Sequence, residues 1–203
     1  LIDGLNSRIA FQSFSDKAEH PVIEGFVVSE NNDTSAVFST SHFNMGSFYM
    51  KPDIKKAPYK VLVNYNGSTY KYQLPDILSS GYVMTTDASD ADMLNILISK
   101  SPGLPSEPLG INIVSKGQLY GSDSIVVGDE NVVSLSFPKR MIPSGVSQIT
   151  LFAKKGNVLA ERKVFVNHMS QMKISSKFDK QSYRPHEKVN MDFQISDYKG
   201  NPV

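Results

Sequence analysis

Cysteine is absent from the 203-residue sequence, and so is any long apolar run. Without a thiol the chain cannot form disulfides, thiolate metal sites or cysteine nucleophiles. This does not identify its compartment, because many exported bacterial proteins also lack disulfides. No stretch of about 18 apolar residues is present, as a membrane-spanning helix would require. Leu1 does not begin a basic and then apolar export signal. We therefore expect a soluble chain, with any targeting segment outside these residues.

The charges of the chain nearly cancel and are not clustered. Its 21 basic and 20 acidic residues leave a formal net charge of +1. Proteins that bind nucleic acid or an anionic membrane surface usually carry a basic patch, so we predict neither partner. With 40% hydrophobic and 20% charged residues, the composition is that of a globular protein with enough apolar residues for a core in each domain.

Short runs of alternating apolar residues, bounded by Gly, Pro, Asn and Asp, follow one another along almost the whole chain. A period of two is typical of half-buried strands. No stretch has the 3.6-residue period of an amphipathic helix. The pattern therefore predicts an all-β protein.

The clearest strand pair is residues 59–74, YKVLVNYNGSTYKYQL. Asn66-Gly67 is the strongest two-residue signal for a hairpin turn. This turn places the large apolar side chains of both strands on one face, whereas a register shifted by one residue would send one strand's apolar set to solvent. The expected pairs are Tyr65 with Ser68, Val63 with Tyr70 and Val61 with Tyr72 on that face, and Leu62 with Lys71 and Asn64 with Thr69 on the other.

Two further segments alternate clearly. Residues 147–167 predict a second hairpin with Gly156 near its tip, in which Lys-Gly and Lys-Lys-Gly loops both leave acceptable pairs. Residues 188–196, KVNMDFQIS, predict a strand with one wet face. Its sides are Val189, Met191, Phe193 and Ile195, which are apolar, and Asn190, Asp192, Gln194 and Ser196, which are polar.

Two polar segments, residues 85–92 (TTDASDAD) and 167–172 (NHMSQM), interrupt this pattern and indicate boundaries. They predict domains at residues 1–87, 88–167 and 168–203. A lone two-stranded piece is marginal in water, so we expect the third segment to pair with the second domain, to exchange strands with a neighbour or to be part of a longer parent. The last explanation is the simplest. The expected strands lie near 7–14, 21–30, 35–41, 46–51, 58–65, 68–74 and 81–86 in the first domain, and near 92–99, 108–115, 131–137, 147–154 and 158–166 in the second.

Residues 178–203, FDKQSYRPHEKVNMDFQISDYKGNPV, resemble the opening of a macroglobulin-type domain. That opening usually reads Tyr-x-Pro-Gly-Glu, then a strand, then Asp-x-x-Gly-x-Pro-Val. His186 stands where Gly is common. The matching residues are Tyr183, Pro185, Glu187, Val189, Asp197, Gly200, Pro202 and Val203.

Upstream segments extend this resemblance over nearly the whole chain, which is similar to bacterial alpha-2-macroglobulin-like envelope proteins. The resemblance implies tandem antiparallel β-sandwich domains of macroglobulin-like, Ig-like type, a first domain without its first strand, and a truncated further domain from residue 168. It also implies an extracytoplasmic location, in the periplasm or at the outer-membrane surface. The family's protease-trapping thioester joins a Cys and a Gln, so this chain cannot form it. The segments are SRIAFQSF, VIEGFVVSENN, FSTSHFNMGSFYMKP, YKVLV, YQLPDILSSGYVM and IPSGVSQITLFAKKGNVLAERKVFVN.

No residues with metal-ligand spacing are found. Asp87, Asp90 and Asp92 lack the Gly and the distal Glu of a calcium-binding loop, so we interpret them as part of a solvated linker. The histidines are far apart in the sequence and are interpreted as surface or turn residues. They are His20, His42, His168 and His186.

No catalytic pattern is found either. Serine is frequent, but no serine lies in a Gly-x-Ser-x-Gly elbow. Residues 99–110, SKSPGLPSEPLG, lack the GK[ST] end of a phosphate-binding loop. We therefore predict no catalytic, cofactor-binding or metal-binding residues, no cofactor and a protein that is not an enzyme.

Three features could indicate binding but have structural interpretations. HFNMG, residues 42–46, is read as a tight connection in which Gly46 supplies an unusual backbone angle. The tyrosines of residues 59–74 are read as a core face rather than an aromatic platform for sugars. Asp-Ser-Ile at residues 123–125 resembles a short O-glycan acceptor sequence of envelope bacteria, which would place Ser124 on an exposed loop.

These observations favour a non-enzymatic spacer and interaction array within a larger envelope protein. Its expected partners are other domains of the same polypeptide. The alternative is a protease-binding or ligand-binding region of a peptidase inhibitor or receptor-associated protein, with specificity on loops 101–108 or 121–130. Its partner would be a protein ligand or a protease.

Overall fold

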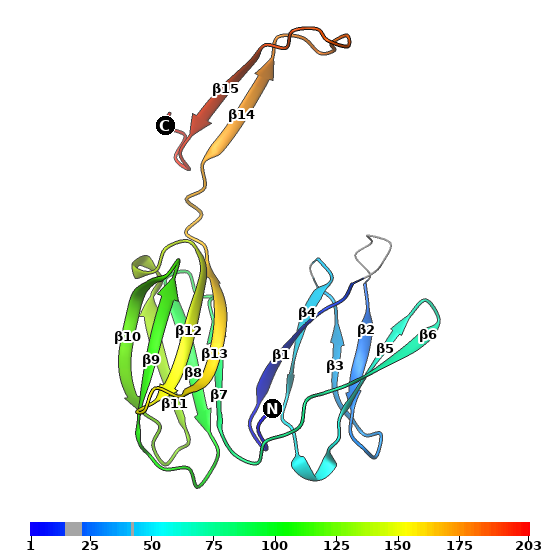
Figure 1. Cartoon of the computed structure of the whole chain (residues 1–203), viewed down its shortest axis with the longest axis vertical. Coiled ribbons are helices and arrows are strands. Elements are labelled where there is room, and N and C mark those ends of the chain that lie inside the picture. Colours follow the sequence, from blue (N-terminus) through cyan, green and yellow to red (C-terminus); the bar gives the residue numbers. More distant parts are fainter. Residues whose placement is uncertain (15–21, 42) are drawn as a thin grey trace.

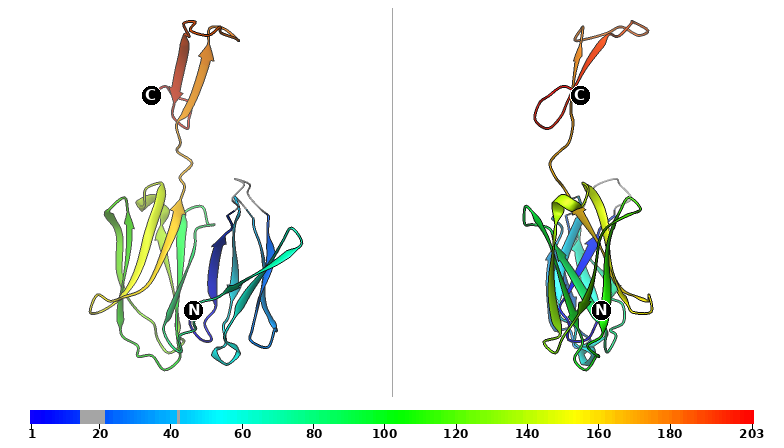
Figure 2. Two further views of the ribbon diagram at one scale, coloured as in Figure 1. Left: turned by 45° about the vertical axis from the view of Figure 1, so that its right-hand side comes forward. Right: turned by 90° about the vertical axis from the view of Figure 1, so that its left-hand side faces the viewer.

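The computed structural model describes residues 1–14, 22–41 and 43–203. These residues form strands β1 to β15 and two short 3-10 helices, Ile54–Lys56 and Lys139–Met141, with no α-helix among them. The prediction of an all-β protein with antiparallel sheets is therefore confirmed. Two β-sandwiches lie side by side, and a separate hairpin stands beyond the end of the second (Figure 1, Figure 2). No helix in the described part of the chain is long and apolar enough to cross a membrane.

The first sandwich packs a two-stranded sheet, β1-β4, against a four-stranded sheet of order β3-β2-β5-β6. Its core is aromatic. The ring centroids of Phe11 and Phe38 are 4.7 Å apart, and those of Phe38 and Phe48 are 5.1 Å apart. The strands are β1 (Ser7–Gln12), β2 (Glu24–Val28), β3 (Thr34–Ser39), β4 (Met45–Met50), β5 (Lys60–Tyr65) and β6 (Ser68–Gln73).

The second sandwich packs a three-stranded sheet of order β11-β8-β7 against a four-stranded sheet of order β10-β9-β12-β13. Every second residue of its central strands is buried, as in Leu94, Ile96 and Ile98 of β8 and Ile111 and Ile113 of β9. These branched side chains fill the space between the sheets. The strands are β7 (Tyr82–Asp87), β8 (Met93–Lys100), β9 (Pro108–Ser115), β10 (Gln118–Val126), β11 (Val132–Pro138), β12 (Gly145–Ala153) and β13 (Val158–Val166).

The predicted boundary after Asp87 is wrong. Strand β7 pairs with β8, and Met84 of β7 is fully buried in the core of the second sandwich. The chain passes from the first sandwich to the second between β6 and β7, where Leu78 forms a bridge with Ile2. Residues 88–92 connect β7 and β8 within the second sandwich and are not an interdomain linker. Small polar residues suit a hairpin connection as well as a linker, so composition alone did not distinguish the two.

Both predicted hairpins are present. In the β5–β6 hairpin every predicted pair is found, from Tyr65 with Ser68 to Val61 with Tyr72. Asn66 and Gly67 both have positive φ, at 50° and 75°, as a type I′ turn requires.

The β12–β13 hairpin resolves the choice between two loop lengths in favour of Lys-Lys-Gly. The backbone N–H of Ala153 donates to the carbonyl of Asn157 at 2.9 Å, which encloses Lys154, Lys155 and Gly156. Gly156 has a φ of +84°. A turn followed by a residue with positive φ is the usual three-residue hairpin loop.

Strand β10 was not predicted, and most of the proposed loop at residues 121–130 belongs to it or to its end. A bulge between Leu119 and Gly121 shifts the pairing of β10 with β9, so the alternation of apolar residues is broken there. Ile125 and Val127 are buried and alternate. These two residues, together with Gly117 in the preceding turn, were the signal that could have revealed the strand.

The third segment consists of β14 (Lys173–Phe178) and β15 (Met191–Ser196), which pair with each other. Strand β15 lies within the predicted strand at residues 188–196. The hairpin stands away from both sandwiches in all views (Figure 1, Figure 2). No residue from 168 to 203 is buried.

Candidate functional site

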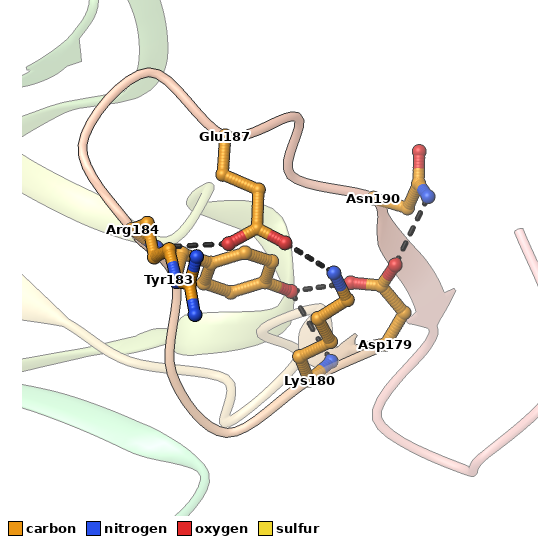
Figure 3. Close-up of polar contacts among 6 residues, drawn as sticks. All are labelled: Asp179, Lys180, Tyr183, Arg184, Glu187 and Asn190. Carbon is orange, nitrogen blue, oxygen red and sulfur yellow. Dashed lines mark hydrogen bonds and ion pairs between the residues drawn. The ribbon is translucent and has the colours of Figure 1, made fainter.

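The long loop between β14 and β15 is closed by a hydrogen-bond network around Asp179 (Figure 3). One carboxylate oxygen of Asp179 accepts a hydrogen bond from the Tyr183 hydroxyl, and the other accepts from the side-chain amide of Asn190 at 3.0 Å. The Tyr183 hydroxyl also accepts from the backbone N–H of Lys180 at 3.2 Å. Asp179 therefore joins the two ends of the loop.

Glu187 organises the turn at the far side of the same loop. Its carboxylate accepts a hydrogen bond from the backbone N–H of Arg184 at 2.9 Å and forms an ion pair with Lys180 (Figure 3). The backbone N–H of Glu187 donates to the carbonyl of Arg184 at 3.1 Å, with Pro185 and His186 between them. Proline in the second position and a positive φ in the third are typical of a type II turn, in which Gly is preferred third.

His186 has a φ of +64°, so it adopts the backbone conformation that favours glycine. The departure from the usual Tyr-x-Pro-Gly-Glu sequence leaves the turn in place, with a non-glycine residue in the left-handed region. His186 therefore has a local structural role.

The carboxylates of Asp179 and Glu187 in this loop are stabilised in their ionised forms. The Tyr183 hydroxyl and then Asn190 lower the pKa of Asp179, whereas Asp179 raises the pKa of Tyr183. The backbone N–H of Arg184, followed by Lys180, lowers the pKa of Glu187. A carboxylate held ionised by donors suits a structural cap, since a general acid or base needs a pKa near the working pH.

Asp197 organises the turn that follows β15 in the same manner. Its carboxylate accepts hydrogen bonds from the backbone N–H groups of Lys199 at 2.9 Å and Asn201 at 2.8 Å, and its pKa is lowered, chiefly by Asn201. Gly200 has a φ of +92°. Pro202 then bridges back to Ser196, so the segment is a strand end, a turn and the start of a return.

One face of the β14–β15 hairpin is apolar and exposed. Ile174 lies opposite Ile195, and Phe178 lies opposite Met191, so these side chains share a face. Phe193, opposite Ser176, lies on the same face. Its two most exposed members, Ile174 and Phe193, are 68% and 65% exposed. We call this surface the hairpin face: Ile174, Phe178, Met191, Phe193 and Ile195.

The other face of the hairpin is polar, which makes the hairpin amphipathic. Large contiguous apolar patches are uncommon on monomeric proteins and mark interaction sites. A sheet with one apolar face normally packs that face against another layer. The hairpin face therefore has the character of a docking surface. The polar residues are Lys173, Ser175, Lys177, Asp192, Gln194 and Ser196.

A second apolar surface is a groove of about 710 Å³ in the first sandwich. The predicted core face of the 59–74 hairpin is only partly a core. Val63 is buried, but Tyr70 and Tyr72 are 46% and 59% exposed. The predicted register of β5 and β6 is right. The tyrosines are less buried than predicted because the two-stranded sheet β1-β4 is narrower than the four-stranded sheet that it covers. We call this surface the tyrosine groove; its lining includes Phe11, Phe14, Tyr65, Tyr70, Tyr72 and Leu74.

The acidic segment at residues 87–92 is tied to Lys139, which is buried. The ammonium of Lys139 donates to the backbone carbonyls of Ala88, at 2.6 Å, and of Asp90. Backbone N–H groups of Met93 and then Asp92 lower the pKa of the Asp90 carboxylate. Lys139 therefore fixes the backbone of this segment.

A second buried lysine, Lys100, binds the loop at residues 101–108. The ammonium of Lys100 donates to the carbonyl of Leu104 at 2.9 Å and to the hydroxyl of Ser106 at 3.0 Å. Burial, followed by the charge of Glu107, raises the pKa of nearby Tyr82. The contacts of this loop are therefore those of a fixed connection.

The histidines are not brought together among the described residues. His168 Nε2 lies 2.6 Å from the carbonyl of Ile142, so it fastens the start of the connection to β14 onto the second sandwich. His20 and His42 lie outside the described residues. In the part of the chain that the structure describes, no three His, Cys, Asp or Glu side chains could hold a metal ion.

Two smaller predictions need correction. Gly46 does not have a positive φ; Phe43 and Asn44 have it instead, at 45° and 55°. A Cβ on Gly46 would lie 2.4 Å from the Phe11 ring, so close packing requires this glycine. Ser124 is exposed as predicted, but it lies in strand β10 rather than in a loop.

Comparison with known proteins adds little. No family model matches the chain, and no curated protein matches it. Among solved structures, the chain is similar to one described as "Biofilm associated protein - BSP domain", with 13% sequence identity and a TM-score of 0.32. The match covers 81% of this chain and 28% of that one. A similarity of this level identifies neither a family nor a function.

Proposed function

We propose that this chain is a non-enzymatic structural and interaction segment of a larger extracytoplasmic protein, built from tandem macroglobulin-type β-sandwiches. The observation that carries the proposal is the hairpin face. It is the surface of the described residues that most requires a second layer, because both of its strands expose their apolar side chains.

The energetics of a small hairpin support this reading. A two-stranded sheet is marginal in water, whereas three strands or a packed layer give independent stability. Complete burial of one Phe, Ile or Met side chain contributes about 1.5–3 kcal/mol. Covering the hairpin face would therefore stabilise the third segment substantially. The proposed cover is further β-structure of the same polypeptide, which would complete a macroglobulin-type domain from residue 168.

The motif residues support the macroglobulin-type assignment because each has a structural task. Tyr183 closes the loop on Asp179, Glu187 holds the turn, and Pro185 occupies its second position. Asp197 caps the following turn. The sequence resemblance therefore rests on residues that shape the backbone, and this supports the sandwich type rather than a chemical activity.

The connections favour a spacer role. His168 anchors the end of the second sandwich, and residues 169–172 then lead directly into β14. Ile2 bridges to Leu78, where the chain leaves the first sandwich. Short, anchored connections limit the relative motion of consecutive domains. Such an array would hold other parts of an envelope protein at a set spacing.

Limited proteolysis of the full-length protein tests the docking role. Phe193→Glu places a charge in the hairpin face, whereas the control Gln194→Glu places it on the polar face of the same strand. We expect rapid cleavage between residues 173 and 196 in Phe193→Glu and little change in Gln194→Glu. Equal cleavage in both variants would contradict the proposal. Reproducible one-to-one binding of a protease by residues 1–203 would contradict a spacer role.

A further inference from the structure

Strand β1 of the first sandwich runs beside β7 of the second (Figure 1, Figure 2). A cleft of about 460 Å³ lies between the two sandwiches there. Its lining comes from both sandwiches. Ligand pockets commonly have volumes of about 300–1,000 Å³, so the cleft has room for one small ligand. The residues that carry the inference are Arg8, Ser41 and Ser47 from the first sandwich and Thr85, Thr86 and Arg162 from the second.

Arg8 faces the cleft from the outer side of β1. Ile9 and Phe11 pack against the core of the first sandwich, so Arg8 and Ala10, which alternate with them, point outward. The Nε and Nη2 atoms of Arg8 each lie 3.2 Å from the hydroxyl oxygen of Ser47 on β4. This contact holds the guanidinium over the surface of the sheet.

Arg162 approaches from the second sandwich. It lies opposite Ile149, which is fully buried, and therefore shares the inner face of the sheet at its β13 edge. Arg162 is half-buried, and its Nη1 donates to the backbone carbonyl of Glu161 at 2.9 Å. The remaining N–H groups of its guanidinium are not bonded to a carboxylate of the described residues.

Neither arginine of the cleft forms an ion pair with a carboxylate of the described residues. Among the described residues, the one salt bridge joins Lys180 and Glu187, far from this cleft. The carboxyl group of Asp87 is influenced by Arg8, but its pKa is lowered chiefly by hydrogen bonds from Ser89 and least by Arg8. Two arginines and four residues with hydroxyl groups thus line the same space.

We propose that this cleft binds a carboxylate-bearing sugar, such as a uronic acid unit. A guanidinium presents paired donors that match the two oxygens of a carboxylate. The Ser and Thr hydroxyl groups can donate to and accept from sugar hydroxyls. A ligand held by Arg8 and Arg162 together contacts both sandwiches and fixes them relative to each other. This proposal does not depend on the docking role of the hairpin face.

Isothermal titration of residues 1–203 with glucuronate, glucose and acetate tests the proposal. We expect glucuronate to bind more tightly than either of the other two compounds. Arg8→Gln and Arg162→Gln should each weaken binding by about tenfold or more, the effect of losing one charge-assisted hydrogen bond. Arg140→Gln is the control, because Arg140 is exposed on the second sandwich and does not line the cleft.

Several outcomes would overturn the proposal. One is the absence of glucuronate binding at millimolar concentration. The others are that glucose, or acetate, binds as tightly as glucuronate. Unchanged affinity in Arg8→Gln would also overturn it. Arg8 is exposed, so this variant should keep the melting temperature of the unmodified chain, and a change in its affinity can be assigned to the cleft.

Discussion

The Tyr183 hydroxyl donates a hydrogen bond to the Asp179 carboxylate and so closes the loop that joins β14 to β15. Asn190 supports the same carboxylate from the other end of the loop at 3.0 Å. These residues lie apart in the sequence but act together. The loop therefore presents β14 and β15 in register, with the hairpin face on one side.

Tyr183→Phe should raise the pKa of Asp179 toward its ordinary value of 3.8, because the hydroxyl is the principal group that lowers it. A carboxyl group with a lowered pKa in the folded state stabilises that state above its unfolded pKa. This contribution is lost as the pH falls through the folded value. The loop should therefore loosen below about pH 3.8 in the native chain. An NMR titration of the Asp179 carboxyl carbon measures the shift.

Tyr198→Phe is the matched control for this titration, because the Tyr198 ring contacts Lys199 and not Asp179. Its Asp179 pKa should equal that of the unmodified chain. If Tyr183→Phe also left the Asp179 pKa unchanged, the assigned hydrogen bond would be wrong.

His186→Gly should stabilise the β14–β15 loop. A left-handed backbone costs an L-residue about 1–2 kcal/mol, part of which the greater freedom of glycine in the unfolded chain offsets. We expect a net gain of about 0.5–1 kcal/mol in the local opening free energy. Hydrogen exchange of the Glu187 amide, which is bonded to Arg184, measures it. His186→Ala keeps the strain and should show no gain; an equal gain in both variants would exclude this explanation.

Lys139→Met should destabilise the second sandwich by about 1–3 kcal/mol, since it leaves the carbonyls of Ala88 and Asp90 without their donor. Methionine keeps most of the side-chain length, so the loss is mainly polar. Urea denaturation measures the change. Arg140→Met, at the exposed neighbouring position, should have little effect. Equal midpoints for Lys139→Met and the unmodified chain would show that Lys139 does not hold the β7–β8 connection.

Turn residues and side-chain alternation predicted the hairpins, in which the paired strands are adjacent in the sequence. Asn66-Gly67 determined the register of β5 and β6, because its turn type and the alternation of side chains agree. The same pattern did not predict that Tyr70 and Tyr72 are exposed, since their burial depends on the width of the opposing sheet. Strand β10 was missed because its bulge after Leu119 breaks the alternation on which the prediction relied.

Long-range relationships were beyond the sequence patterns. Residues 85–92 have the composition of a linker, and only the pairing of β7 with β8 assigns them to the second sandwich. The buried ammonium of Lys139 binds carbonyl groups about 50 residues away, which no local spacing indicates. Arg8 and Arg162 likewise line one cleft only because the two sandwiches lie side by side. By contrast, His186 was recognised as a departure at a glycine position, and its positive φ explains why glycine is usual there.

Hydroxyl-radical footprinting of Phe193 tests the central claim most directly, by comparing isolated residues 1–203 with the larger protein proposed above. Phe193 is 65% exposed in the hairpin face, and Phe165, which is 61% exposed on β13, is the internal reference. The account predicts that Phe193 is oxidised as readily as Phe165 in the isolated chain and is strongly protected, relative to Phe165, in the full-length protein. Equal oxidation of Phe193 in both samples would contradict a docking role for the hairpin face.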